Sequence, residues 1–90
     1  MVLWDAHNVE HVARHGVTPN EVEEVVRTDQ ARWFTDDTVR LGRLVALGPT
    51  TTGRLLVIVL DRPTPTGVAY CVTARPMSAR ERQDYERANE

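Results

Sequence analysis

Arginine is the residue best suited to chemistry in this sequence, and four arginines gather near its C-terminal end. Arg75 ends an apolar run, and Arg80, Arg82 and Arg87 follow it within a predicted helix. A planar guanidinium holds phosphate or carboxylate oxygens at two points, and the N-terminus of a helix favours anions. This grouping predicts an anion site where the last strand meets the last helix.

Carboxylates in the same segment allow a simpler interpretation. Glu81, Asp84 and Glu86 stand among these arginines, and opposite charges four residues apart form ion pairs on an exposed helix. Such surface pairs add little stability and carry no chemistry. The spacing alone is compatible with both an anion site and a solvated helix.

Three histidines recur every fourth residue near the N-terminus. His7, His11 and His15 therefore share one side of a predicted helix. Two of them could hold zinc only with further ligands, and the chain offers one cysteine and no other histidine. We interpret these residues as a polar helix edge, and we expect no metal site and no cofactor.

Capping residues position these groups by starting three helices. Each predicted helix follows a side chain that can accept a hydrogen bond from the first turn, and the second also has Pro at its first position. The predicted caps and helices are Asp5 with residues 6–15, Thr18 with residues 19–27, and Ser78 with residues 79–88.

Between the second and third predicted helices, the spacing of the apolar residues changes from every third or fourth position to every second position. Short turns rich in Pro, Gly, Thr and Asp separate the segments, which favours antiparallel hairpins. Trp33 and Phe34 fall in the first of these segments, and we interpret them as core residues rather than as a partner's interface. The predicted strands are residues 31–34, 39–47, 54–61 and 68–75.

These elements predict one α+β domain over residues 1–90, with two N-terminal helices, a four-stranded antiparallel sheet and a C-terminal helix. No apolar run approaches the length of a membrane span, and the first residues lack the pattern of a signal peptide. Cys71 lies in a β-branched run and is expected to be a buried thiol. We therefore expect a cytoplasmic protein with no membrane association.

The charge balance gives no general attraction to nucleic acid. The net charge is −2, although all 11 basic residues are arginine, a bias that a GC-rich coding sequence also explains. No helix has a basic face suited to the major groove of DNA. RNA binding would therefore depend on a local patch.

Four blocks of sequence together resemble the BrnT family of type II toxins. They span nearly the whole chain, and their joint order is more specific than any single block. The blocks are Trp4-Asp5-x-x-Asn8-x-Glu10-His11-Val12-x-x-His15-Gly16-Val17, Glu21-x-x-Glu24, Gly53-Arg54-Leu55-Leu56-Val57-Ile58-Val59, and Thr73-Ala74-Arg75-Pro76-Met77-x-x-x-Glu81-Arg82-x-x-Tyr85.

The resemblance implies a RelE-like ribonuclease fold and inhibition of translation by RNA cleavage without a metal ion. It also implies a small antitoxin partner of the ribbon-helix-helix class, through which alone the toxin would reach DNA. The residues at the family's recurrent positions are His15, Gly16, Arg75, Glu81, Arg82 and Tyr85.

Cleavage through the RNA 2′-hydroxyl needs a base, an acid and cations for the extra negative charge. We expect Arg75 and Arg82 to stabilise charge, His15 or Glu81 to move a proton, and Tyr85 to position or stack the substrate. Arg54 and Arg80 are the expected RNA-binding residues.

Two of these residues have structural alternatives, and so does the whole chain. Glu81 completes a capping box with Ser78, which already explains its spacing, and Tyr85 could be a core anchor of the last helix. The chain could also be a non-catalytic module that binds a protein partner through its acidic second helix. The net charge of −2 favours that alternative.

Overall fold

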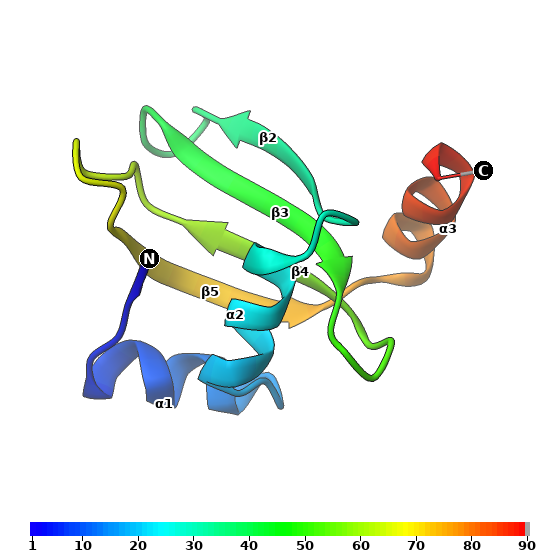
Figure 1. Ribbon diagram of the computed structural model, residues 1–90, viewed down its shortest axis with the longest axis horizontal. Helices are drawn as coiled ribbons and strands as arrows, with labels where there is room; N and C mark the ends of the chain where they lie inside the picture. Colours follow the sequence, from blue (N-terminus) through cyan, green and yellow to red (C-terminus); the bar gives the residue numbers. More distant parts are fainter. Residues whose placement is uncertain (90) are drawn as a thin grey trace.

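The structure is a computed structural model and describes residues 1–89. Within that range the chain forms three helices and five strands (Figure 1). The elements are β1 (Val2–Leu3), α1 (Ala6–Arg14), α2 (Pro19–Arg27), β2 (Arg32–Asp36), β3 (Arg43–Pro49), β4 (Leu55–Leu60), β5 (Ala69–Pro76) and α3 (Ala79–Ala88).

The five strands form one mixed sheet in the order β1-β5-β4-β3-β2. The predicted α+β class and three helices are confirmed, but the predicted four-stranded antiparallel sheet is wrong. Val2 and Leu3 add a fifth strand, which pairs in parallel with Ala69 and Tyr70 of β5. Two residues show no alternation of apolar and polar side chains, so the sequence pattern could not reveal this strand.

Each helix begins with a capping box. Asp5, Thr18 and Ser78 each accept a hydrogen bond from the backbone N–H three residues later. The side chain of that third residue, Asn8 or Glu81 for example, accepts one in return from the cap's own N–H. These paired bonds satisfy backbone N–H groups that have no acceptor within the first helical turn. Residues able to form them mark a helix start in the sequence, so the three helix starts were predictable.

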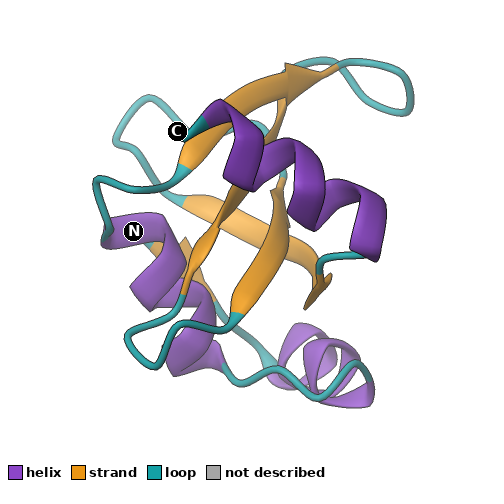
Figure 2. Cartoon of the chain, turned by 90° about the vertical axis from the view of Figure 1, so that its right-hand side faces the viewer, coloured by secondary structure: helices purple, strands orange, loops and turns teal. Residues whose placement is uncertain are grey.

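Helices α1 and α2 cover one face of the sheet and build the main core with it. Val12, Val22 and Val25 are fully buried there, as are Leu56 and Ile58 of β4. Helix α3 stands apart, at the end of the sheet where β3 and β5 finish (Figure 1). Figure 2, viewed from that end, shows α3 in front of the strands and separate from the other helices. The opposite face of the sheet is therefore only partly covered.

A buried amide holds the N-terminal segment to the sheet. Asn8 is 1 % exposed, and its Nδ2 donates to the carbonyl oxygens of Leu3 at 2.9 Å and Cys71 at 3.2 Å. Its Oδ1 accepts from the backbone N–H of Asp5 at 2.8 Å. One side chain thus joins β1, α1 and β5, because a buried amide must find partners for its donors and acceptor.

The predicted strand at residues 39–47 begins late, at Arg43. The six residues before it form a turn in which Asp37 Oδ1 accepts from the Gly42 N–H at 2.7 Å, and Asp36 Oδ1 accepts from the Thr38 N–H at 3.0 Å. Side chains that bond the nearby backbone compete with a β-ladder. Val39 and Leu41, predicted to alternate within the strand, are exposed instead.

A second difference lies in β5. The register between β4 and β5 shifts at Val59 and Leu60, so that Leu60 pairs with Cys71 while Val59 pairs with Thr73. The extra residue turns both Cys71 and Ala74 into the main core, although simple alternation predicts opposite faces for them. Burial raises the pKa of the Cys71 thiol to about 12, so the cysteine is a packed, unreactive group.

Replacing Asn8 tests its role as the joint between three elements. We expect Asn8→Ala to lower the free energy of unfolding by about 2 kcal/mol, because it leaves two buried carbonyls and one N–H without their partner. Urea denaturation measures this loss. The matched control is Asn20→Ala, at an exposed position of α2, and equal unfolding midpoints for the two variants would contradict the assigned role.

Candidate functional site

A groove of about 600 Å³ lies on the face of the sheet that α1 and α2 leave open. Its floor is aliphatic, with Val45 and Leu47 from β3 and Val57 and Val59 from β4. Strand β2, Arg75 of β5 and helix α3 supply the walls. The groove therefore combines an apolar floor with polar groups at its rim, as ligand sites commonly do.

The strand register places two arginines on opposite sides of this floor. Arg32 pairs with Leu47, Leu47 with Val57, and Val57 with Arg75, so the four residues form one row across β2 to β5. Three steps between strands separate the two arginine Cα atoms by about 14 Å. A second row, Phe34 opposite Val45, runs beside it and brings an aromatic ring to the groove.

Arg75 is held in place by a two-point ion pair with Glu81. Its Nη1 lies 2.6 Å from Oε1 and its Nη2 lies 2.8 Å from Oε2. Nη1 also donates to the carbonyl oxygen of Pro76 at 3.2 Å. The side chain is still 43 % exposed, so the fixed guanidinium can be reached from the groove.

Glu81 acts at the same time as the cap of α3. Its Oε1 accepts from the backbone N–H of Ser78 at 2.8 Å, in addition to the bond from Arg75. Hydrogen bonds from Arg75, and after them the one from Ser78, lower the pKa of the Glu81 carboxyl to about 2. The same bonds to Glu81 raise the pKa of Arg75. At neutral pH such a carboxyl carries no proton to donate and is a weak base, which suits an orienting role better than proton transfer.

Tyr85 anchors α3 to the sheet. It is 7 % exposed and packs with Val45, Val57 and Met77 in a second, smaller core on the groove side. Its hydroxyl donates to the Gln30 carbonyl oxygen at 2.7 Å. The ring lines the groove, but its one proton is already used within the protein.

The other predicted site residues lie outside the lining of this groove. His15 ends α1, is exposed, and has its ring 5.4 Å from that of His11 in an edge-on arrangement. Arg80 is 85 % exposed and lies 3.6 Å from Asp84, and Arg82 is exposed on α3. The structure therefore brings together Arg75, Glu81 and Tyr85 but leaves out His15, Arg80 and Arg82.

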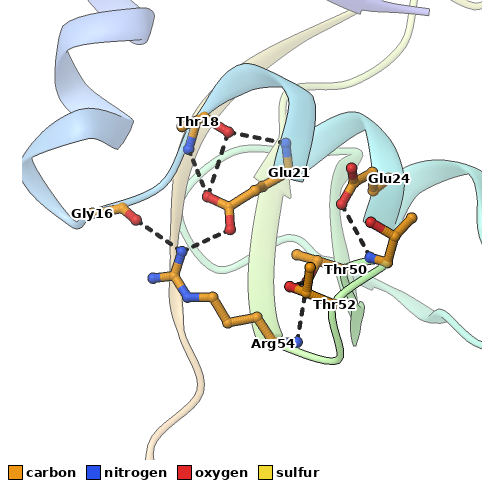
Figure 3. A network of polar contacts seen from close by, with 8 residues as sticks. Gly16, Thr18, Glu21, Glu24, Thr50, Thr52 and Arg54 are labelled. Carbon is orange, nitrogen blue, oxygen red and sulfur yellow. Dashed lines mark hydrogen bonds and ion pairs between the residues drawn. The ribbon is translucent and has the colours of Figure 1, made fainter.

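Arg54 belongs to a separate polar network at the junction of α1, α2 and β4 (Figure 3). Its Nη1 donates to the Gly16 carbonyl oxygen at 2.9 Å and to Glu21 Oε2 at 2.8 Å. Burial raises the pKa of Glu21, but bonds from Arg54 and Thr18 outweigh it and lower the pKa overall. Arg54 thus ties the helical turn to the sheet, and RNA contact by this residue stays a prediction.

The acidic face of α2 is partly used in the same way. Glu24 Oε1 accepts from the backbone N–H of Thr51 at 3.0 Å, so this carboxylate fastens α2 to the turn between β3 and β4 (Figure 3). Glu23 lies 3.4 Å from Arg27 on the same helix. These acids have partners inside the domain, which weakens the case for α2 as a docking surface.

The groove contains residues that sequence reasoning did not select. Arg32, Phe34 and Asp36 share the groove side of β2, and Phe34 is 51 % exposed rather than part of the core. Trp33, also predicted for the core, is 42 % exposed. The sequence could have revealed this group, because Arg32, Phe34 and Asp36 stand at alternate positions. Alternate residues of a strand share one face, so two charged side chains and an aromatic ring lie together there.

Comparison of the sequence with protein-family models and with curated proteins finds no match. Within residues 1–89, no helix is long and apolar enough to cross a membrane. The same range holds no group of three or more His, Cys, Asp or Glu side chains arranged for a metal ion. The geometry of the groove is therefore the main basis for a functional proposal.

The ion pair between Glu81 and Arg75 predicts a specific pH dependence. Glu81→Gln keeps an oxygen for the cap but removes the charge. Because the carboxyl pKa falls from 4.5 to about 2 on folding, the stabilisation is complete above about pH 4.5 and is lost as the pH falls through 2. Solvent screening at the exposed Arg75 reduces this contribution to the free energy of unfolding to about 1 kcal/mol at neutral pH.

Urea denaturation of wild type and Glu81→Gln between pH 7 and pH 2 measures this difference. Glu86→Gln, at an exposed position of the same helix, is the matched control and should follow wild type throughout. A wild-type advantage that persists unchanged to pH 2 would show that the ion pair is not its source.

Proposed function

We propose that this chain is a BrnT-like type II toxin, a metal-independent endoribonuclease that inhibits translation by cutting RNA. Two findings support the proposal: the α+β arrangement of three helices and a sheet, and a groove whose rim carries arginine. The sequence resemblance described above supplies the reaction class. The activity belongs in the cytoplasm, where its RNA substrate is made and translated.

The observation that carries the proposal is the fixed guanidinium of Arg75 on the rim of an open groove. Arg75 is oriented by Glu81 before any ligand arrives, and preorganised charge stabilises a transition state without reorganisation at the moment of reaction. A phosphate in the groove would meet Arg75 at one side and Arg32 at the other.

Phe34 adds a reason to favour a single strand. Its ring is half exposed beside the apolar floor, and unpaired bases stack on such rings whereas bases within a duplex do not reach them. In the proposed complex the backbone lies across the groove between the two arginines, and one base rests on Phe34.

Three carboxylates also line the groove, and each has a partner in the domain. Glu81 is paired with Arg75, Asp84 lies near Arg80, and Asp36 accepts two hydrogen bonds from Thr38. Arg32 has no carboxylate within 4 Å among residues 1–89. Arg32 therefore offers a positive charge that no carboxylate of this range pairs, while Asp36, bonded only to the neutral Thr38, keeps its negative charge on the same strand.

In the proposed reaction the RNA 2′-hydroxyl attacks the adjacent phosphorus and loses its proton to water in the open groove. The bond to the 5′-oxygen breaks, and this oxygen takes a proton from water, which leaves a 2′,3′-cyclic phosphate and a 5′-hydroxyl. Arg75 stabilises the negative charge that gathers on the phosphoryl oxygens, and Glu81 is its positioning residue. Tyr85 holds α3 in place beside them. His15 and Arg82 enter the proposal only for RNA that extends beyond the groove lining.

The proposal includes a partner. A small ribbon-helix-helix antitoxin would cover the toxin, inhibit it, and connect it to operator DNA. No DNA contact by this chain itself is proposed.

Charge reversal at Arg75 tests the proposal. We expect Arg75→Glu to abolish growth inhibition on induced expression, and to lower the rate of RNA cleavage by the purified protein at least about 100-fold, because the charge that stabilises the transition state is lost. Arg75→Gln, which adds no repulsion against Glu81, keeps the test meaningful if the reversed variant fails to fold. Arg87→Glu, at an exposed α3 position outside the groove lining, is the matched control. Full cleavage by a folded Arg75 variant would remove this residue from the site.

The interaction-module alternative is tested by expression with and without the neighbouring gene. A toxin arrests growth when induced alone, and co-expression of its antitoxin restores growth. We expect both results, scored as colony-forming units over time. A module that binds through α2 predicts no arrest in either case. It also predicts that partner binding is lost when the acids of α2, Glu21, Glu23 and Glu24, are neutralised.

A further inference from the structure

Strand β2 forms one edge of the sheet, and among the features that prevent edge pairing it has charged side chains at its two ends, Arg32 and Asp36. Four of its five residues are exposed, among them Trp33 and Phe34. The register with β3 runs from Arg32 to Asp36 without a bulge, and the strand contains neither proline nor lysine. A regular edge that exposes aromatic side chains in this way can pair with another strand.

The sequence of this strand is complementary to itself. It reads Arg32-Trp33-Phe34-Thr35-Asp36, with opposite charges at the two ends and an aromatic ring at the centre. If two copies pair antiparallel about Phe34, Arg32 of each copy stands opposite Asp36 of the other. Directly opposed side chains on one face of a sheet interact, and opposite charges and aromatic pairs are both favourable there.

Only this register produces that match. A shift of one residue would oppose side chains from different faces of the sheet. A shift of two, centred on Trp33, places Arg32 opposite Phe34 and Asp36 opposite Gln30. Centring on Thr35 instead places Asp36 opposite Phe34. The charges therefore select the register centred on Phe34.

Both charged groups are available for the pairing. Arg32 makes only a 3.4 Å contact from Nη1 to the Ala88 carbonyl oxygen among residues 1–89. Asp36 uses Oδ1 for its bonds to Thr38, and its Oδ2 has no hydrogen-bond partner in that range. On its other side Asp36 stands opposite Arg43 of β3, so a partner's arginine would extend a row of alternating charge.

We infer that β2 is a homodimerisation edge, on which a second copy of this chain pairs antiparallel about Phe34 to join the two sheets. Two Arg32–Asp36 ion pairs flank a central pair of phenylalanine rings. Because Arg32, Phe34 and Asp36 also line the groove, the two grooves share the Phe34 pair as a common border. This inference does not depend on RNA cleavage.

Sedimentation equilibrium over a concentration series tests the dimer with the whole chain. Wild type should dimerise reversibly, and higher salt should weaken the dimer because the flanking ion pairs are exposed. Arg32→Asp alone and Asp36→Arg alone each oppose like charges at two places, and each should raise the dissociation constant about tenfold or more. The double variant, Arg32→Asp with Asp36→Arg, restores both pairs and should recover wild-type affinity.

Mixing the two single variants provides the most specific test of the proposed register. The new aspartate of one chain then faces the new arginine of the other, and the unchanged Asp36 faces the unchanged Arg32. A heterodimer should form from two proteins that pair weakly with themselves. Arg87→Asp is the matched control and should dimerise like wild type, while thermal melts confirm that each variant is folded.

Two outcomes would overturn the inference. Wild type could stay monomeric at every concentration at which it remains in solution, or it could form a dimer that the single charge reversals leave unchanged. The second outcome would place the interface elsewhere on the molecule. Loss of RNA cleavage without loss of dimerisation concerns the proposed function alone, so the two proposals fail separately.

Discussion

The carboxylate of Glu81 is the group on which the arrangement of the open face depends. It completes the cap of α3 through Ser78 and holds Arg75 at two points, so one side chain sets both where the helix begins and where the guanidinium lies. Tyr85 then fixes the helix body against the sheet and the Gln30 carbonyl. Geometry at the rim of the groove therefore follows from a helix-start motif, and a change in the cap changes the charge presented to a ligand.

The central strands serve two cores at once. Leu56 and Ile58 of β4 face the main core under α1 and α2, while Val57 faces the smaller core and the groove. This explains why residues 55–60 form an unbroken apolar run, since a strand covered on both faces has no polar side. A floor that is already part of a packed core is rigid, which favours precise placement of the groups at its rim.

The sequence predicted those features that are encoded locally, and it failed where distant segments decide the outcome. Capping residues located all three helices, and Arg75 and Glu81 were selected together because they fall within one short segment. Strand β1 could not be predicted, because only its pairing with β5 makes it a strand. Arg32 and Phe34 were missed for a similar reason, because their position beside Arg75 depends on the register of four strands. In addition, an aromatic residue in an apolar segment suggests burial unless the strand is known to lie at the edge of the sheet.

The parallel pairing of β1 with β5 also bears on how the chain is made. Val2 and Leu3 are synthesised well before Ala69 and Tyr70, the residues with which they pair. Val2 is only 7 % exposed in the folded protein, so during translation this apolar segment is exposed until the strand that buries it has been made. Long-range pairing of this kind forms slowly, because distant parts of the chain must first meet. Closure of this edge of the sheet is therefore a late event in biogenesis, and the β1 segment stays without its partner strand until then.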